Sequence, residues 1–351
     1  MIRCTECGKN PAAKAIGLCV DCLRTKTEEQ ISSHIHKPVR QKFELPLHPP
    51  KSDNSVTCRQ CANQCRMTNT EIGYCGVRTN QNGKLRDKAP KGSALATMYL
   101  DPLPTNCCAA WFCSGSYQSG YNLAVFFYGC NFDCLFCQNA SHKLIKEAPV
   151  VTEDEMVGKA LDRDVRCVCF FGGSPEPQFH FALRVARRIM DESDHQKHIC
   201  WEWNGCGNHA LVKKAVQLSA ETGGTVKFDL KAFHPGIVRA MCGVDNQQAF
   251  HNFKALAKQF PNRDLLTATT LLVSYYVDQC EVDAIAKFIS GCNPDIPYSL
   301  LVFHPDFFMR DLLVTPKQQV EECYEAARRH LKRVNIGNRH LLQFASENEK
   351  K

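Results

Sequence analysis

The chain has 351 residues, which is enough for one large core or for one core with a smaller appendage. Apolar residues make up 44% and charged residues 23%, as in a soluble globular protein, and no apolar run approaches the ~20 residues that a membrane span needs. The net charge of +7 is spread along the chain without a basic block, which is compatible with an acidic partner but does not favour nucleic acid.

The sequence contains 22 cysteines, and this number decides the class of protein. Many of them stand in C-x-x-C spacing, which suits metal ions better than disulfides. The first residues contain no apolar signal region, so we expect a cytoplasmic protein with reduced thiols. Together these features predict several metal sites in a protein of an anaerobic cell.

Residues 1–24 contain two C-x-x-C pairs, Cys4 with Cys7 and Cys19 with Cys22. Four thiolates from two such pairs form the ligand set of a small structural zinc ribbon, with a rubredoxin-like iron site as the alternative. Residues 25–50 are polar and proline-bearing, which predicts a linker.

Residues 51–120 are rich in cysteine, glycine and asparagine, and we expect irregular structure there. Four cysteines of this region form a second closed ligand set, for structural zinc or an auxiliary [4Fe–4S] cluster: Cys58, Cys61, Cys65 and Cys75. Cys107, Cys108 and Cys113 follow them. These three could join such a site, or Cys113 could act as a thiol donor.

From residue 121 to 342, β-rich apolar runs alternate with amphipathic helical stretches. We expect strands at 123–128, 167–171, 198–203, 225–230, 265–273 and 298–303. Helix signals lie between them: the capping box Thr152-x-x-Glu155, an Asn208 cap with a Gly223 stop, a stop at Gly291, and Thr315-Pro316 at a helix start. Six strand-plus-helix units predict an α/β fold, a partial (βα)6 barrel with its site at the C-terminal ends of the strands. Residues 343–351 form a polar tail.

Directly after the first expected strand come Cys130, Cys134 and Cys137. Three thiolates can hold three irons of a [4Fe–4S] cluster and leave the fourth iron open, which is typical of a catalytic rather than a structural metal site. The C-x-x-x-C-x-x-C spacing, with Phe136 before the last cysteine, resembles the signature of the radical S-adenosylmethionine (SAM) superfamily. The resemblance implies that SAM binds the open iron. An electron from a donor such as ferredoxin or flavodoxin then cleaves SAM to methionine and a 5′-deoxyadenosyl radical, which abstracts hydrogen from a carbon.

Other expected strand ends resemble SAM-binding segments of the same family. Gly172 and Gly173 match its Gly-Gly-Glu-Pro turn, whose backbone meets the amino group of SAM, although Ser174 stands where the family has Glu and Glu176 follows two residues later. The remaining candidates by resemblance or position are Glu202 and Asn204 in Trp201–Gly205, Asp229 and Lys231 in a D-x-K element, and His304 after the last expected strand. Asp229 and Lys231 are two residues apart, so they share one face of a strand.

The segment from Cys58 to Arg78 resembles the region before the SAM motif in an activating-enzyme-like branch. That branch is related to pyruvate formate-lyase activating enzyme and includes the AmmeMemoRadiSam proteins, and the resemblance extends over roughly residues 56–342. An insertion at Thr105–Cys113 is associated with archaeal members. Cys206, placed after the third strand, is expected to face the site, whereas other cysteines are interpreted as buried apolar residues: Cys167, Cys169, Cys200, Cys242, Cys280, Cys292 and Cys323.

The resemblance implies a radical SAM enzyme that acts on a carbon of a protein or peptide, for post-translational modification or glycyl-radical activation. Two alternatives stay open. One is a cobalamin-dependent C-methyltransferase that modifies methyl-coenzyme M reductase. The other is a non-catalytic zinc-ribbon adaptor, which predicts loss of a cluster cysteine or of the strand-end residues. The sequence does not identify the substrate.

Overall fold

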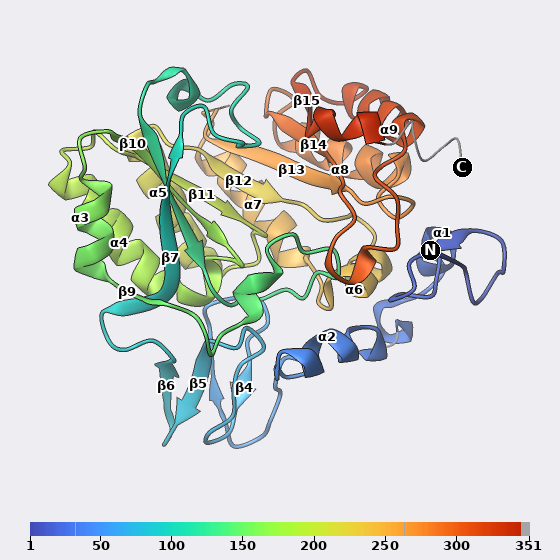
Figure 1. The fold of residues 1–351 in the computed structure, drawn as a ribbon, viewed down its shortest axis with the longest axis horizontal. Coiled ribbons are helices and arrows are strands. Elements are labelled where there is room, and N and C mark those ends of the chain that lie inside the picture. The colour runs from blue at the N-terminus through green and yellow to red at the C-terminus, as the bar shows by residue number, and fades with distance from the viewer. Residues whose placement is uncertain (32, 263, 345–351) are drawn as a thin grey trace.

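The computed structural model describes residues 1–31, 33–262 and 264–344, so the end of the predicted polar tail, residues 345–351, lies outside the described residues. A nine-stranded sheet forms its centre, with the order β15-β14-β13-β12-β11-β10-β8-β7-β9 (Figure 1). Neighbouring strands from β8 to β15 are parallel, as strand–helix–strand units require. These strands are β8 (Tyr121–Phe127), β10 (Val165–Gly172), β11 (His198–Trp203), β12 (Val226–Asp229), β13 (Leu266–Leu272), β14 (Tyr298–Val302) and β15 (Val334–Gly337).

The six predicted strands are all present, and the sheet extends beyond them at both edges. β15 was not predicted, and neither were β7 (Ser93–Pro102) and β9 (Val150–Thr152), which are antiparallel to their neighbours. β7 corrects the expectation of irregular structure over 51–120, because it is a ten-residue strand paired along β8. Small residues and a proline weaken the local strand signal of β7, so this segment is a strand because it pairs with β8 rather than because of its own sequence.

The helices between the parallel strands cover the face of the sheet that carries Trp201 and Trp203. Phe179 of α4 packs against these two rings, with centroid distances of 6.2 and 5.7 Å. The indole N–H of Trp201 donates to the Ala215 carbonyl of α5 over 2.9 Å, which satisfies the only polar group of this buried side chain. The helices are α3 (Glu153–Ala160), α4 (Phe179–Glu192), α5 (His209–Thr222), α6 (Pro235–Cys242), α7 (Gln247–Gln259), α8 (Gln279–Cys292) and α9 (Lys317–Arg328).

Two predicted helix starts and one predicted stop are confirmed. The Thr152 hydroxyl accepts a hydrogen bond from Glu155 N at the start of α3, and the Glu155 carboxylate accepts one from Thr152 N. These two bonds form a capping box. The Asn208 side chain caps α5, and Gly223 ends it in the left-handed conformation with φ 69°.

Two other helix ends differ from the prediction. α8 continues through Gly291 to Cys292, so that glycine is helical rather than a stop. At α9 the N-cap is Pro316. Thr315 instead joins two strands, because its hydroxyl donates to the Leu272 carbonyl and accepts from Phe303 N, each over 2.8 Å.

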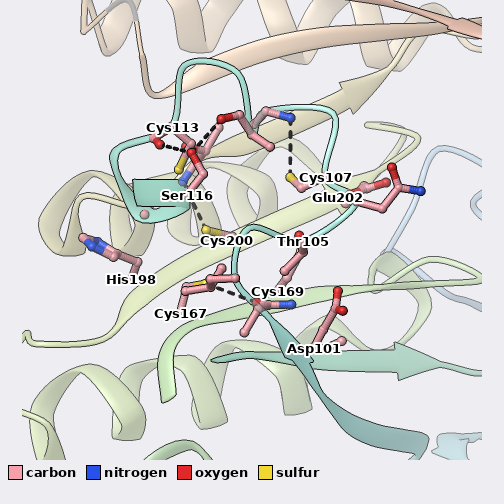
Figure 2. Close-up of a pocket in the computed structure, with 18 of the residues that line it drawn as sticks. Asp101, Thr105, Cys107, Cys113, Ser116, Cys167, Cys169, His198, Cys200 and Glu202 are labelled. Atoms are coloured by element: carbon pink, nitrogen blue, oxygen red, sulfur yellow. Dashed lines mark hydrogen bonds between the residues drawn. The ribbon is translucent and has the colours of Figure 1, made fainter. Parts of the chain in front are cut away.

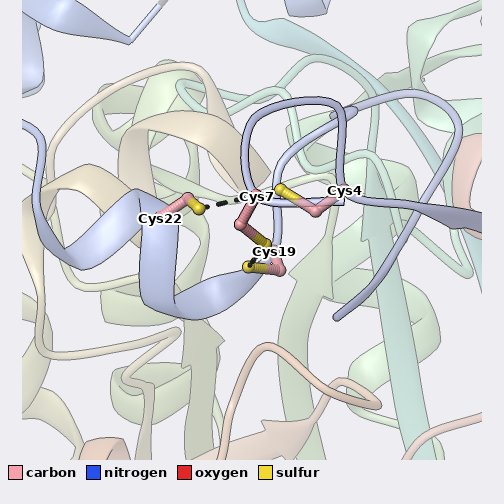
Figure 3. Close-up of side chains that lie close together, drawn as sticks. All are labelled: Cys4, Cys7, Cys19 and Cys22. Atoms are coloured by element: carbon pink, nitrogen blue, oxygen red, sulfur yellow. Dashed lines mark hydrogen bonds between the residues drawn. The ribbon is translucent and has the colours of Figure 1, made fainter. Parts of the chain in front are cut away.

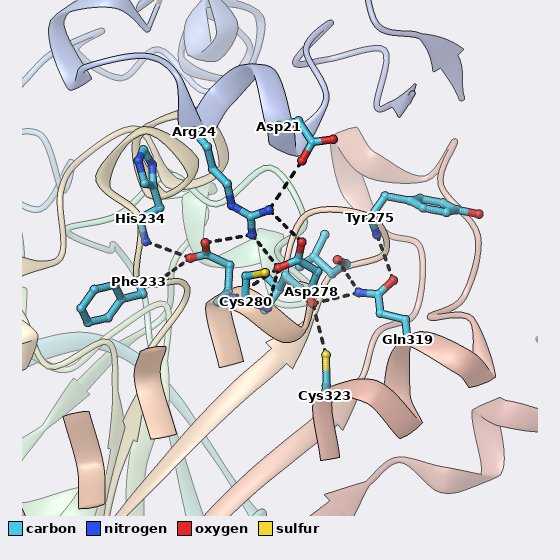
Figure 4. Close-up of polar contacts among 12 residues, drawn as sticks. Asp21, Arg24, Phe233, His234, Tyr275, Asp278, Cys280, Gln319 and Cys323 are labelled. Carbon is cyan, nitrogen blue, oxygen red and sulfur yellow. Dashed lines mark hydrogen bonds and ion pairs between the residues drawn. The ribbon is translucent and has the colours of Figure 1, made fainter. Parts of the chain in front are cut away.

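The N-terminal residues pack against the sheet-and-helix unit. Arg24 donates to Asp278 over 2.9 Å and to Glu281 over 3.1 Å at the start of α8 (Figure 4). The expected linker contains α2, whose Val39 and Arg40 are buried, so this segment is a packed part of the fold. The elements before β7 are β1 (Ile2–Arg3), β2 (Pro11–Ala12), α1 (Val20–Arg24), α2 (Lys37–Lys42), β3 (Val56–Thr57), β4 (Arg66–Met67), β5 (Arg78–Gln81) and β6 (Lys84–Asp87). Among the described residues, no helix has both the length and the apolar character that crossing a bilayer requires.

Candidate active site and metal sites

A cavity lies at the C-terminal ends of β8, β10, β11 and β12, where the sequence places the site. It encloses about 930 Å³, including its open mouth. The predicted site residues that line it are Cys130, Cys134, Cys137, Gly172, Gly173, Glu202, Asn204, Asp229 and Lys231. The structure therefore brings together residues that are spread over 100 positions of the sequence, from the cysteine loop to the end of β12.

Gly172 and Gly173 let β10 end against the cysteine loop. Gly172 has φ +113°, and a Cβ there would lie 2.5 Å from Phe127 N. A Cβ on Gly173 would lie 2.3 Å from the Gly129 carbonyl oxygen, closer than real contacts allow. Only glycine fits both positions, because a side chain would clash with the main chain of Phe127 and Gly129, and both glycines line the cavity.

Behind this turn, Glu176 connects the ends of β10 and β11. Its carboxylate accepts from Gly205 N over 3.0 Å and from the Ser174 hydroxyl, and it is completely buried. Burial raises the pKa of Glu176 to about 7, against the lowering effect of these hydrogen bonds. Glu176 does not line the cavity, so it positions the two strand ends rather than meeting a ligand.

Asn204 ties β11 to the cysteine loop. Its side-chain amide pairs reciprocally with that of Asn131, over 2.7 and 3.2 Å, and its Nδ2 lies 3.9 Å from Sγ of Cys130. Sequence reasoning missed Asn131, although its place directly after Cys130 was the available signal. The Asn131–Asn204 pair therefore holds Cys130 against the end of β11 without the help of a ligand.

Asp229 and Lys231 form an ion pair on the cavity wall. The Lys231 ammonium also lies 5.5 Å from the ring centroid of Phe136, inside the cysteine loop. Burial raises the pKa of Asp229, while the charge of Lys231 opposes that rise. Among the residues that the structure describes, none hydrogen-bonds Oδ1 of Asp229 or Nδ1 of His142, and both residues line the cavity. Buried polar atoms without partners indicate that a polar ligand belongs there.

Asp133 fixes the cysteine loop through the contacts of its buried carboxylate. Its carboxylate lies 2.5 Å from the Lys143 ammonium, 3.0 Å from Nδ1 of His36 and 3.4 Å from the Arg40 guanidinium. Burial would raise the pKa of Asp133, but the charges of Lys143 and Arg40 and the hydrogen bond from His36 hold it well below its usual range. The loop thus depends on α2 and on the segment after Cys137, neither of which the sequence connected with the site.

Two expectations about single residues do not match the structure. His304 lines neither this cavity nor the inner cavity described below, and its ring is exposed and 3.4 Å from the Asp306 carboxylate. Cys206 was expected to face the site, but its side chain is buried in the apolar core. Cys242 is buried in the core as predicted, and its sulfur lies 3.6 Å from that of Cys134.

The four cysteines of residues 1–24 converge on one point (Figure 3). Sγ of Cys4 lies 3.7 Å from Sγ of Cys22, and Sγ of Cys7 lies 3.8 Å from Sγ of Cys19. A tetrahedron with Zn–S bonds of about 2.3 Å has sulfur-to-sulfur edges of about 3.8 Å. The donor set therefore fits zinc in both number and spacing.

The second group, Cys58, Cys61, Cys65 and Cys75, is buried but more widely spaced. Within the described part of the chain, these four sulfurs do not all lie within the 4.8 Å that joins the N-terminal four. Burial, together with the neighbouring thiols, raises the pKa of Cys61. The group also contacts the segment that follows β11, because Ala62 N donates to the Cys206 carbonyl over 2.8 Å. A closed site here, for zinc or a cluster, remains a prediction.

A second cavity lies deeper, on the inner face of the same strands (Figure 2). Its walls are alternate residues of β8, β10, β11 and β12, which share one face of the sheet. These include Cys167, Cys169 and Cys200, so the cysteines interpreted as apolar core residues line a cavity instead. The loop that carries Cys107 and Cys113 closes the cavity, and Phe171 and Glu202 line both cavities.

Comparison with known proteins agrees with this geometry. Residues 124–289 match the radical SAM superfamily. A 133-residue segment is 28% identical to the isethionate sulfite-lyase activating enzyme of Desulfovibrio desulfuricans, covering 38% of this chain but only 40% of that protein. An uncharacterized protein of Methanocaldococcus jannaschii is 24% identical over 298 residues, which is 82% of each chain.

Solved structures with a similar arrangement include a domain of a pyruvate-formate lyase-activating enzyme from Bacteroides vulgatus. Its TM-score is 0.41 at 15% identity, over 49% of this chain and 98% of that one. Streptococcus suis SuiB bound to its precursor peptide SuiA has a TM-score of 0.46 at 14% identity, over 64% and 49% of the two chains. The family match covers residues 124–289, which include the three-cysteine loop that predicts it, and an activating enzyme is among the similar proteins.

Proposed function

We propose that this protein is a radical SAM enzyme that abstracts hydrogen from a carbon of a protein or peptide substrate. The observation that carries the proposal is the cavity that gathers three cysteines, two glycines and the Asp229–Lys231 pair at the C-terminal strand ends. A [4Fe–4S] cluster and SAM bound there would supply a 5′-deoxyadenosyl radical by reductive cleavage of SAM.

The residues present fit both groups. Cys130, Cys134 and Cys137 offer three thiolates at the wall of an open cavity. The exposed main chain at Gly172–Gly173 would meet the amino group of SAM. Asn204, Asp229 and Lys231 would bind its other polar groups, and the unpartnered Oδ1 of Asp229 is an acceptor for a hydroxyl or ammonium donor.

A protein or peptide substrate is supported by the similarity to an enzyme named as the activator of another protein, isethionate sulfite-lyase. Glycyl-radical activation and another post-translational modification are both outcomes of the same hydrogen abstraction. A reduced ferredoxin or flavodoxin would supply the electron, and we place the protein in the cytoplasm. The adaptor alternative predicts missing site residues, yet all of those named above are present and lie in one cavity.

The test is anaerobic reconstitution with iron and sulfide, followed by reduction in the presence of SAM. We expect 5′-deoxyadenosine from the native chain and none from Cys134→Ala, which should also lose about four irons per chain. Cys280→Ala removes an exposed thiol of α8 and serves as the matched control. No 5′-deoxyadenosine from the native chain would overturn the proposal. Corrinoid bound to the purified protein, with methyl transfer to a substrate, would establish the methyltransferase alternative instead.

A further inference from the structure

Two neighbouring cysteines and a glutamate meet inside the barrel, away from the three-cysteine loop. One ligand atom each from Cys107, Cys108 and Glu202 lies within 4.8 Å of the other two. The two cysteines belong to the loop after β7, and Glu202 lies on β11. Sequence reasoning allowed these cysteines to join the Cys58–Cys75 group instead, because nothing in their spacing indicated that the loop crosses the open side of the sheet.

The loop is held in place from the opposite strands. The Ser299 hydroxyl of β14 donates to the Cys108 carbonyl over 2.8 Å, and the Trp111 indole donates to the same oxygen over 3.1 Å. Donors also reach the sulfurs themselves: the Thr269 hydroxyl lies 3.2 Å from Sγ of Cys108, and Ala109 N lies 3.4 Å from Sγ of Cys107. Hydrogen bonds to ligating sulfurs orient them and stabilise their thiolate forms.

A buried ammonium completes the cluster. Nζ of Lys227 is 3.3 Å from the Glu202 carboxylate, 3.4 Å from Sγ of Cys107 and 3.1 Å from Sγ of Cys169. Two thiolates and one carboxylate around a divalent ion leave one negative charge in excess, which the Lys227 ammonium would neutralise. This balance matters because Lys227 is only 2% exposed, and an uncompensated charge at such depth is costly.

We propose that Cys107, Cys108 and Glu202 bind a zinc ion, with Lys227 as its outer-shell partner. Two sulfurs and one carboxylate form a ligand set that zinc accepts, and three protein ligands leave a fourth position open. That position faces a cavity, because the Glu202 side chain is 44% exposed and lines both cavities. A water molecule, or a sulfur, nitrogen or carboxylate donor of a molecule in the inner cavity, can occupy it. The proposal does not depend on radical chemistry.

The first experiment compares the zinc content of the full chain before and after removal of the pair. We expect Cys107→Ala/Cys108→Ala to contain about one zinc per chain less than the native protein, and Cys280→Ala to match the native protein. Glu202→Gln should weaken zinc binding at this site by at least roughly 10-fold, because even the loss of an outer-shell partner of a metal ligand typically costs that much affinity. Equal zinc content in the double variant and the native chain would overturn the proposal, and so would loss of iron and sulfide in place of zinc.

The second experiment uses the native chain and does not depend on the variants folding. Metal-bound thiolates react slowly with N-ethylmaleimide, so Cys107 and Cys108 should be protected in the zinc-loaded protein and become alkylated after chelation. Peptide mass spectrometry separates these two cysteines from the N-terminal four. Rapid alkylation of the pair in zinc-loaded protein, or a disulfide between the two cysteines, would contradict the assignment.

Discussion

The four-cysteine group of residues 1–24 and the three-cysteine loop after β8 are both cysteine-rich, yet they are built in opposite ways. The N-terminal sulfurs already lie at the spacing of a zinc tetrahedron, with 3.7 and 3.8 Å between pairs. The loop has one thiol fewer, and its sulfurs line a cavity instead of converging. A closed set of ligands favours a structural role, whereas an open set beside a cavity favours catalysis.

The two regions also differ in what would hold them in shape. The apolar cluster beside the N-terminal thiols is small, with Cys4, Ala12 and Cys19, although Ala13, Ile16 and Leu23 of the same segment pack in the main core. The loop has more polar partners: Asp133 N and Leu135 N donate to carbonyls of α6, each over 2.9 Å, and the Asp133 carboxylate has three cationic or imidazole neighbours. We infer that the first region folds with its metal and that the second is formed before its cluster arrives.

Replacing Cys22 with Ala should have the largest local effect. Structural zinc contributes about 10–16 kcal/mol in small zinc-binding domains, and a segment of this size has too little core to fold without it. Hydrogen exchange of residues 1–24 should become fast, while amides of β8, β10 and β11 stay protected. If residues 1–24 kept their protection, the inferred difference between the two regions would be wrong.

Asp133→Ala should come next, because it leaves Lys143 and Arg40 buried without their counter-charge. Removing one partner of a buried charge pair typically costs about 3–5 kcal/mol. Anaerobic urea unfolding should show this loss together with poor retention of the iron of the loop. Asp154→Asn, which breaks an exposed pair with Arg188, is the control and should change stability by less than about 1 kcal/mol.

Glu176 should give the loop region a pH dependence of its own. Its folded pKa of about 7 lies above the usual value of 4.5, so the stability that its protonated form contributes is present at low pH and is lost as pH rises from about 4.5 to 7. The native chain should therefore lose up to about 3 kcal/mol relative to Glu176→Gln over this range. Denaturant unfolding of both proteins at pH 5 and pH 7.5 measures the difference. If the difference in unfolding free energy between the two proteins were the same at both pH values, this role of Glu176 would be excluded.

Arg24→Ala tests the junction between the two regions and should have the smallest effect. Its guanidinium is 23% exposed and bonds two carboxylates, so its loss should cost about 1–3 kcal/mol. Zinc content should not change, whereas limited proteolysis between residues 25 and 50 should become faster. Lys317→Ala breaks an exposed pair on α9 and provides the comparison, with no change in cleavage expected.

The strands and the glycine turn were predictable because their signals are local. Apolar runs mark β8 and β10 to β14, and the paired glycines identify a turn that no other residue can make. Cys206 was misplaced because a position after a strand does not determine the direction of the side chain: Gly205 has φ +80°, which turns the chain and directs Cys206 into the core. His304 lies two residues beyond the end of β14, where position alone does not determine the direction of its side chain either.

The contacts that complete the site were not predictable, because they join distant segments. Nothing near Asp133 in the sequence indicates His36 or Arg40, which lie 97 and 93 residues away. Cys107 and Cys108 likewise become a candidate metal site only when Glu202 of β11 is placed beside them. Chemistry carried by one segment could be predicted, whereas chemistry shared between segments needed the fold.

The contact between Arg24 and Asp278 has a consequence for the order in which the chain is made. These residues are 254 positions apart, so a ribosome has released Arg24 long before its partner exists. During that interval the first 24 residues can acquire a metal but have no surface to dock on. Docking must wait until α8 has been synthesised, and the α2 segment must wait with it for the barrel. Residues 1–24 are therefore made before the surface on which they dock, and they reach their final position only after α8 exists.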